Sequence, residues 1–284
     1  MRVITKKKGN KDYYYLQHSF RKGGKVVTKE KYLGAEIPKN VDEIKGDFSR
    51  ELKKDLYKKL EKIKANFQSE WKRIPKSVQE KEKEQISIAF TYNSNAIEGS
   101  TITLNEVREI IQDKISPNKP IRDVKEAEMH NKVFLEMLDK KDKISQEMLL
   151  KWHKDIFGET KTDIAGKYRS YLVRVGSYIA PHWNVIRLTM SQIVEFVNKS
   201  KLNPVELAAR AHYKFESIHP FGDGNGRIGR LLMNYILWNA GYPMLIIEYK
   251  KRKSYYDAFP KGQEIFVEYF LKRYLAVHKK RYVK

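Results

Sequence analysis

The sequence predicts a mainly α-helical protein with two short excursions into β-structure. Across residues 41–115, apolar side chains recur at spacings of three and four among lysines and glutamates, which is the period of an amphipathic helix. Residues 12–20 and 25–33 are instead rich in aromatic and β-branched residues, and Gly23 and Gly24 lie between them. Two such runs around a glycine pair predict a β-hairpin. We therefore expect a helical body and a small N-terminal β-hairpin unit.

Caps and breaks divide the helical region. The ring of Pro75 interrupts a helix, so a second helix is expected over residues 78–98. Gly99 suits the left-handed conformation that often ends a helix. Thr103 to Glu106 has the spacing of a capping box for the next helix. The apolar face of the first helix is expected to hold Leu52, Leu56, Leu60 and Ile63.

The second half of the chain is also mainly helical, with one interruption. Residues 166–181 change to aromatic and β-branched composition, and Gly176 and Ser177 supply a turn inside this segment. A short β-hairpin is therefore expected there. Prolines break the chain at residues 116–120, and helices are predicted over residues 121–139, 145–157, 189–199, 204–217 and 226–240.

Composition excludes several classes of protein. With 41% hydrophobic and 12% aromatic residues, the 284-residue chain can build a core, which excludes global disorder. The sequence has no cysteine, which excludes disulfides and thiolate metal sites. No apolar run reaches the roughly 18 to 20 residues of a membrane span, and the N-terminus lacks the apolar stretch of a secretory signal. We expect a cytoplasmic protein that makes no membrane contact.

The net charge of +22 is concentrated at the two ends of the chain. Residues 1–64 hold 19 Lys and Arg against 9 Asp and Glu, and residues 249–284 hold 11 against 3, which leaves +4 for residues 65–248. Clustered basic residues favour a nucleic-acid partner. Nucleic-acid binding through the basic ends, including the aromatic N-terminal hairpin, is therefore one candidate function.

The segment HPFGDGNGRIGR, His219 to Arg230, contains Gly224, Gly226 and Gly229 at the spacing of a dinucleotide-binding fingerprint. Such a fingerprint must follow a buried strand and open a helix inside a parallel βαβ unit. Here the preceding segment is predicted to be helical, and the sequence lacks the alternation of strands and helices that a parallel sheet needs. A dinucleotide site is therefore not favoured.

The same loop has the composition of a phosphate-transfer site. Glycines at a helix start free backbone N–H groups, which bind phosphate together with the helix dipole. Arg227 and Arg230, three residues apart, lie on one face of that helix and can bind phosphate oxygens. Asp223 is a carboxylate that can hold Mg²⁺ bridging two phosphates. His219 is a neutral base near pH 7, suited to taking a proton from a hydroxyl.

At every specified position this loop matches the H-P-F-x-D-G-N-G-R-x-x-R motif, and so the chain resembles the Fic (Fido-domain) family, over about residues 85–278. The resemblance implies a helical fold that transfers AMP from ATP to a side-chain hydroxyl of a protein, this chain included, and releases pyrophosphate. It implies that His219 is the catalytic base and Asp223 the Mg²⁺ ligand. It assigns phosphate binding to Gly224, Asn225, Gly226, Arg227, Ile228, Gly229 and Arg230.

The resemblance also divides the chain. It implies a Fic core over residues 141–278 and, before it, a helical region over residues 38–140 that carries an inhibitory motif. Residues 1–37 then form a separate basic β-hairpin unit, and residues 279–284 form a basic tail.

The inhibitory motif of the family resembles Ser94 to Gly99, SNAIEG. Glu98 would lie in the last turn of a helix, where the helix dipole disfavours negative charge, so a cationic partner is expected elsewhere. The resemblance names Arg230 as that partner, with Ser94 as part of the motif, and implies that the pair blocks the triphosphate. It also implies that in some members the glutamate supports the reverse reaction. The alternative is a solvated Glu98.

Two further segments resemble the substrate-binding parts of the family. Residues 171–181 match its flap, whose exposed strand can hold a target segment by main-chain pairing; an ordinary hairpin covering the core is the alternative. Tyr255 and Tyr256 resemble a tyrosine pair that lines the adenine pocket, although such pairs also serve as core packing. Gln263 lies where relatives often carry Asn, which weakens a polar adenine contact there. The flap residues expected nearest the nucleotide are Val175, Gly176, Ser177 and Tyr178.

Three hypotheses thus stand at this point: an AMP-transferring enzyme, a nucleic-acid-binding module, and a Fic-fold enzyme that transfers another phosphate-containing group. The first two are compatible in one chain. The intact motif favours AMP over other groups.

Overall fold

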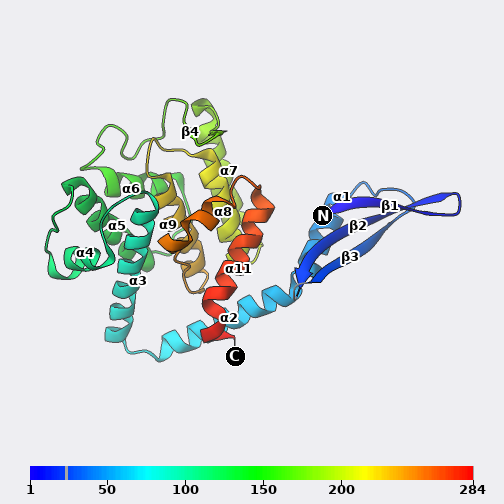
Figure 1. The fold of residues 1–284 in the computed structure, drawn as a ribbon, viewed down its shortest axis with the longest axis horizontal. Helices are drawn as coiled ribbons and strands as arrows, with labels where there is room; N and C mark the ends of the chain where they lie inside the picture. The colour runs from blue at the N-terminus through cyan, green and yellow to red at the C-terminus, as the bar shows by residue number, and fades with distance from the viewer. Residues whose placement is uncertain (23–24, 284) are drawn as a thin grey trace. The chain divides into compact units, whose positions relative to one another are not determined.

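A computed structural model describes residues 1–22 and 25–283, and it divides the chain into two compact units, residues 1–59 and 60–284 (Figure 1). The boundary falls inside helix α2 (Lys54–Arg73). The finer division expected at residues 140 and 278 stays a prediction. None of the helices in the described part of the chain has the length and apolar composition of a membrane span.

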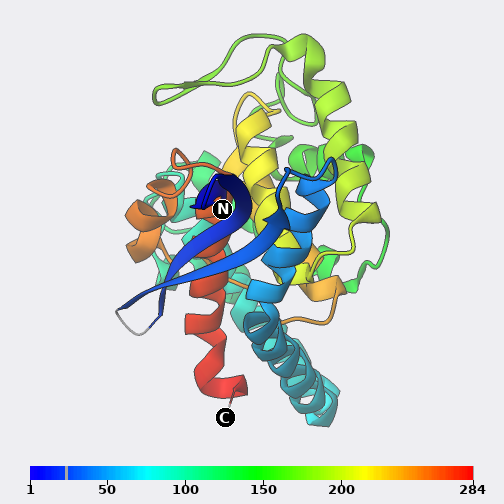
Figure 2. The same ribbon diagram turned by 90° about the vertical axis from the view of Figure 1, so that its right-hand side faces the viewer.

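The first unit is a three-stranded antiparallel sheet with one helix against it. Strands β1 (Arg2–Lys8), β2 (Lys11–Lys22) and β3 (Lys25–Gly34) follow in that order, and Figures 1 and 2 both place α1 (Val41–Leu52) against the sheet. Leu16 and Phe48 are both buried and supply the core of this unit. The hairpin of β2 and β3 is confirmed by the pairing of Lys22 with Lys25; its two glycines lie outside the described residues. Strand β1 was not predicted.

The second unit begins with helices whose ends lie at the breaks and caps predicted from the sequence. Helix α2 ends two residues before Pro75, and α3 (Lys76–Ile97) follows it. Gly99 is left-handed, with a φ of +96°, and the N–H groups of Gly99 and Ser100 bond the carbonyls of Ala96 and Asn95. This is a Schellman end. The capping box of Thr103 and Glu106 starts α4 (Leu104–Arg108), which runs on as a π-helix, η1 (Glu109–Asp113).

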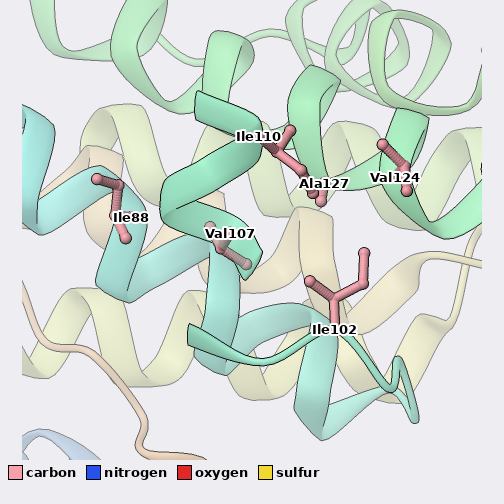
Figure 3. Packing of buried hydrophobic residues seen from close by; sticks show 6 residues of the cluster. All are labelled: Ile88, Ile102, Val107, Ile110, Val124 and Ala127. Atoms are coloured by element: carbon pink, nitrogen blue, oxygen red, sulfur yellow. The ribbon is translucent and has the colours of Figure 1, made fainter. Parts of the chain in front are cut away.

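A cluster of buried aliphatic side chains joins the middle of α3 and the segment after it to α5 (Ile121–Asp139) (Figure 3). The connecting segment, α4 and η1 all contribute to it. Because α3 and α5 are packed together in this way, residues near the end of α3 and the start of α5 are held on one side of the unit. The cluster consists of Ile88, Ile102, Val107, Ile110, Val124 and Ala127.

Helices α3, α5, α6 and α8 surround α9. Helix α8 packs against α7, α9 and α11, and α9 also contacts α3, α5 and α6 (Figure 1). The segment expected to be a hairpin has only two-residue strands, β4 (Arg174–Val175) and β5 (Tyr178–Ile179). The helices are α6 (Gln146–Phe157), η2 (Trp183–Val185), α7 (Ile186–Lys199), α8 (Pro204–Ile218), α9 (Asn225–Asn239), η3 (Tyr249–Lys251), α10 (Arg252–Tyr256) and α11 (Gln263–Tyr282). The long C-terminal helix α11 was not predicted.

Candidate active site at the start of α9

The loop between α8 and α9 is fixed by its own backbone and side chains. His219 ends α8 in the left-handed conformation, with a φ of +51°, and Gly224 starts α9 with a φ of +75°. A Cβ on Gly224 would collide with the ring of Phe157, so this position needs glycine for space as well as for conformation. The first backbone N–H groups of α9 have no acceptor within the helix, which makes its start an anion-binding site.

The side chain of Asn225 holds this loop in shape. Its Oδ1 accepts from the N–H of Phe221 at 2.8 Å, and its Nδ2 donates to the carbonyl of Phe221 at 2.9 Å. Of the expected phosphate-binding residues, Asn225 can therefore offer only its backbone. The side chain of Ile228 is fully buried in the core, and Gly229 faces Glu216 and His212, so phosphate binding at these two positions stays a prediction of the resemblance.

Arg230 is the largest fully buried side chain near the loop, and its guanidinium bonds the end of α3. Its Nε donates to Ser94 Oγ and its Nη2 to the Ser94 carbonyl, both at 2.9 Å, and Nη2 lies 2.6 Å from Glu98 Oε1. Burial disfavours the charge on Arg230, but the Glu98 carboxylate together with Tyr255 and Tyr256 outweighs this effect and raises the arginine pKa. The Schellman end of α3 thus delivers a carboxylate to a buried guanidinium.

The Glu98 carboxylate also lies against the first turn of α9. A Cβ added to Gly226 would collide with Glu98 Oε1 and approach Arg230 Nη1. An acidic oxygen therefore already occupies the place where the helix start and Arg230 would together hold a phosphate. The adjoining polar cavity measures about 130 Å³, well below the roughly 300 Å³ at which ligand pockets begin.

A second carboxyl group, Glu216, lies near Arg230 without neutralising it. Its Oε1 is buried and has no hydrogen-bond partner among the described residues. Burial, followed by the charge of Glu98, raises the pKa of Glu216 to about 8, so this group is largely protonated at neutral pH. Glu98 is consequently the carboxylate that balances Arg230.

Arg227 belongs to a different group of charges. Its Nη1 pairs with Glu126 Oε2, and its guanidinium lies 4.4 Å above the ring of Phe157. Lys161 Nζ lies 2.5 Å from Glu126 Oε1 and 3.0 Å from Asp223 Oδ2. These two cations and two carboxylates form a charge-balanced quartet: Glu126, Lys161, Asp223 and Arg227. Arg227 is therefore paired with Glu126 in this conformation, and the contact with phosphate that the sequence led us to expect stays a prediction.

Asp223 has the surroundings of a metal ligand. Its side chain is half exposed, and its Oδ1 accepts from the N–H of Gly224 at 2.6 Å. Burial opposes ionisation, but Arg227 and Lys161 lower the Asp223 pKa. No group of three or more His, Cys, Asp or Glu side chains gathers for a metal ion among the described residues. A single carboxylate fits Mg²⁺, which often takes one or two protein carboxylates and completes its shell with phosphate and water.

His219 is half-buried beside these groups. Burial lowers its pKa; the Glu216 carbonyl opposes the shift and the charge of Arg169 adds to it. The imidazole is therefore neutral at pH 7, as a general base requires.

Arg169 connects the His219 turn to the flap. Its guanidinium donates to the carbonyls of His219 at 2.8 Å, Tyr171 at 2.6 Å and Pro181 at 2.7 Å. Tyr171 and Pro181 lie at the two ends of the flap segment. One buried side chain thus fixes the base of the flap relative to His219.

The flap itself is exposed on both strands. Gly176 has a φ of +60°, and Val175 pairs with Tyr178 across the turn. Tyr178 donates from its hydroxyl to the carbonyl of Ser217 at 2.9 Å, two residues from His219. The flap residues expected near a nucleotide, Val175, Gly176, Ser177 and Tyr178, therefore lie in an exposed hairpin tied to the end of α8.

The structure separates the two tyrosines expected at the adenine. Tyr255 is only 1% exposed, and its hydroxyl lies 2.6 Å from His212 Nε2, so it packs in the core and cannot reach a nucleotide in this conformation. Tyr256 is 43% exposed, and its ring packs against the ring of Tyr255. Gln263 is half-buried at the start of α11.

Residues 143–237 match the Fic/DOC family. This segment is a Fic/DOC domain. The matched segment contains the whole loop from His219 to Arg230, whereas Glu98 lies outside it.

Curated relatives carry the name protein adenylyltransferase Fic. That of Nematostella vectensis is 37% identical over 174 residues, covering 58% of this chain and 41% of the relative. That of Culex quinquefasciatus is 36% identical over 183 residues, covering 60% of this chain and 36% of the relative. The alignments therefore span less than half of these relatives.

Solved Fic structures have the same fold. Fic-1 (aa134–508) from C. elegans aligns with a TM-score of 0.70 and 26% identity, covering 86% of this chain and 76% of that one. A Fic-domain signaling protein from Bacteroides thetaiotaomicron aligns with a TM-score of 0.65 and 26% identity, covering 80% and 95%.

Sequence reasoning missed four residues of this site: Glu126, Lys161, Arg169 and Glu216. Three of them act through partners more than 30 residues away, which no local spacing encodes. Glu216 had a detectable signal, because it is a carboxylate in the last turn of the helix predicted over residues 204–217, three residues before His219.

Proposed function

We propose that this chain transfers AMP from ATP to a side-chain hydroxyl of a target protein, itself included, and releases pyrophosphate. The observation that carries the proposal is the arrangement around the start of α9, where a neutral histidine, a half-exposed aspartate and a buried arginine surround a carboxylate at an anion-binding helix start. The names of the curated relatives support the same reaction.

In this proposal His219 takes the proton of the target hydroxyl as its oxygen attacks the α-phosphorus. The new bond joins that oxygen to the α-phosphorus, and the bond from the α-phosphorus to the bridging oxygen of pyrophosphate breaks. The first N–H groups of α9 and Arg230 hold the negative phosphate oxygens. The flap presents the target segment by main-chain pairing, and the exposed Tyr256 contacts the adenine, with Tyr255 supporting it from below.

Asp223 would hold Mg²⁺, which would neutralise phosphate charge and favour departure of pyrophosphate. Lys161 and Arg227 already keep the Asp223 carboxyl ionised, so no proton must leave when a cation arrives.

Glu98 would act as a brake in the resting chain. Its carboxylate occupies the anion site at Gly226 and pairs with Arg230, and a γ-phosphate would need both. A triphosphate could then settle only after Glu98 moves. Whether the same glutamate also supports removal of AMP stays a prediction of the resemblance.

The transferred group is tested by labelling ATP at two positions. The Glu98→Gly chain is incubated with Mg²⁺ and ATP carrying radioactive phosphorus at either the α or the γ position. We expect label on the protein from α-labelled ATP alone. Label from γ-labelled ATP would instead support transfer of phosphate, the alternative that the sequence left open, and would overturn AMP transfer.

Removing the Lys161 cation should tighten metal binding. Its Nζ lies 3.0 Å from Asp223 Oδ2, and unit charges about 4 Å apart near a protein surface interact by about 4 kcal/mol. We expect Lys161→Ala to bind Mn²⁺ roughly tenfold more tightly, which corresponds to about 1.4 kcal/mol. Electron paramagnetic resonance of free Mn²⁺ in the presence of ATP measures this.

The matched control for Lys161 is Lys125→Ala. Lys125 forms an exposed ion pair with Glu159 at 2.8 Å, so its loss removes the same charge from the same unit. Equal Mn²⁺ affinity in both variants and the wild type would mean that Lys161 does not influence a metal at Asp223.

A further inference from the structure

The catalytic proposal leaves the N-terminal unit unused, although the strands of this unit are strongly basic. Residues 1–34 carry ten Lys and Arg against two acidic residues, Asp12 and Glu30, a net of +8. Residues 41–52, which form α1, carry two basic residues against four acidic ones, a net of −2. The sheet is therefore strongly basic, and the helix against one of its faces is acidic.

The two faces of the sheet differ in what they offer a partner. Leu16 is fully buried, which places its face of the sheet against α1. Side chains point alternately to opposite faces along a strand, so Tyr15 and Gln17 belong to the open face. Lys6 and Arg2 lie on the same face, because Lys6 Nζ lies 5.0 Å above the Tyr15 ring and 2.5 Å from Glu30 Oε2, and Arg2 bonds Gln17 at 2.8 Å.

The open face combines cations with a central row of aromatic and polar groups. By the same alternation and pairing, its described cations are Arg2, Lys6, Lys8 and Lys11, and all four are exposed. The central groups reach across all three strands: Gln17 bonds Glu30 at 3.0 Å, and Ser19 bonds Thr28 at 2.8 Å. These are the residue types that contact phosphates and base edges in nucleic-acid complexes.

The aromatic rings of this face are not arranged as a platform for unpaired bases. Tyr32 packs on Tyr15 at 5.2 Å and on Tyr13 at 6.2 Å, with interplanar angles of 52° and 44°. Lys6 covers the Tyr15 ring as well. Stacking of single-stranded bases needs aromatic rings whose faces are exposed and lie parallel to the bases. The rings therefore stiffen the face instead of offering stacking sites.

The dimensions favour a duplex. The axes of the two outer strands lie two inter-strand spacings apart, roughly 10 Å, which is within the roughly 12 Å width of the major groove of B-DNA. Duplex RNA is a poorer fit, because its major groove is deep and narrow. From these observations we propose that the open face of the N-terminal sheet is a binding surface for double-stranded DNA, entering the major groove with its basic residues against the flanking phosphates.

The test measures binding of the full chain to a fluorescent 24-base-pair DNA duplex, roughly two helical turns, by anisotropy between 50 and 200 mM salt. Four phosphate contacts give a slope of about −3.6, so the wild type should lose roughly 150-fold in affinity over this range. The triple variant Lys6→Gln, Lys8→Gln, Lys11→Gln should lose only about 3- to 4-fold, since one contact remains. Its AMP transfer to itself should stay at the wild-type rate.

The matched control removes three charges from the other face: Lys7→Gln, Lys29→Gln and Lys31→Gln. This control should keep most of the salt slope, and Lys279→Gln with Lys280→Gln should do so too, because those lysines lie at the other end of the chain. Circular dichroism checks that each variant keeps its fold.

Three results would overturn the proposed DNA-binding surface. One is absence of DNA binding at 50 mM salt, and another is an equal loss of DNA affinity in the two triple variants. The third is tighter binding to single-stranded DNA or duplex RNA than to duplex DNA. Equally tight binding to vesicles of anionic lipid would show a general attraction to negative charge and would contradict the proposal as well.

Discussion

Glu98→Gly is expected to raise AMP transfer, measured as self-modification, by roughly 10- to 100-fold, since a brake that leaves about 1% of molecules open limits the gain to about 100-fold. The variant removes the carboxylate that lies at Gly226 and 2.6 Å from Arg230. It thereby frees both the helix start and the guanidinium for phosphate. The initial rate with α-labelled ATP measures the gain.

The same substitution should weaken the resting protein. Arg230 is 1% exposed, and removing one partner of a buried ion pair leaves the other charge uncompensated. Because the Glu98 side chain is 27% exposed, we expect a loss of about 1 to 3 kcal/mol in the free energy of unfolding, less than the 3 to 5 of a fully buried pair. ATP with Mg²⁺ should restore stability, and more so in Glu98→Gly than in the wild type.

Glu98→Gln separates charge from shape. It keeps the size of the side chain at the end of α3, so activation close to that of Glu98→Gly would show that the charge is the brake. Unchanged transfer in both variants, with both folded by circular dichroism, would remove Glu98 from the regulation of this site.

His219→Ala is expected to lower AMP transfer by about 10² to 10⁴-fold, which is the range supplied by a general base. Because His219 has a φ of +51°, His219→Asn is the better-folded companion variant, since Asn tolerates this conformation. Both variants are made in the Glu98→Gly chain, because its higher rate of AMP transfer allows a large decrease to be measured. Binding of ATP, followed as a thermal shift, should be retained, because His219 acts on the hydroxyl and not on the triphosphate.

The pH dependence gives an independent check on His219. Burial lowers its pKa below the ordinary value of 6.5, and the neutral form is the active base. Transfer should therefore stay level as pH falls to about 6.5 and decline only at lower pH. A decline centred above pH 7, or full activity of His219→Asn, would contradict the assignment. The exposed His182 provides the control variant, His182→Ala, which should transfer AMP at the undiminished rate.

Local signals carried the prediction of the fold. Pro75, Gly99 and the Thr103–Glu106 capping box each act on their own few residues, and the helices begin and end where these residues require. Strand β1 was not predicted because it is stabilised mainly by pairing with β2, and its sequence RVITKKK shows little alternation of apolar and polar residues. The catalytic loop could also be predicted from local sequence, because its motif, His219 to Arg230, is one continuous segment.

The partners of the loop could not be predicted in the same way. Arg227 is bound by Glu126, 101 positions earlier in the chain, and Arg169 joins the flap to His219 across 50 residues. Such contacts depend on how α5 and the flap pack on α9, which spacing does not encode. Tyr255 illustrates the same limit, since only its packing against His212 distinguishes it from the exposed Tyr256.

The central claim is that one triphosphate lies against His219, Asp223 and Arg230 once Glu98 is gone. A crystal structure of the Glu98→Gly chain with Mg²⁺ and an ATP analogue that resists cleavage between its α- and β-phosphates tests this most directly. We expect the γ-phosphate at Arg230, in the place of the lost carboxylate, and the α-phosphate at the start of α9 facing the imidazole of His219. A nucleotide bound elsewhere, with Arg230 still turned toward Ser94 and the start of α9 empty, would contradict the account.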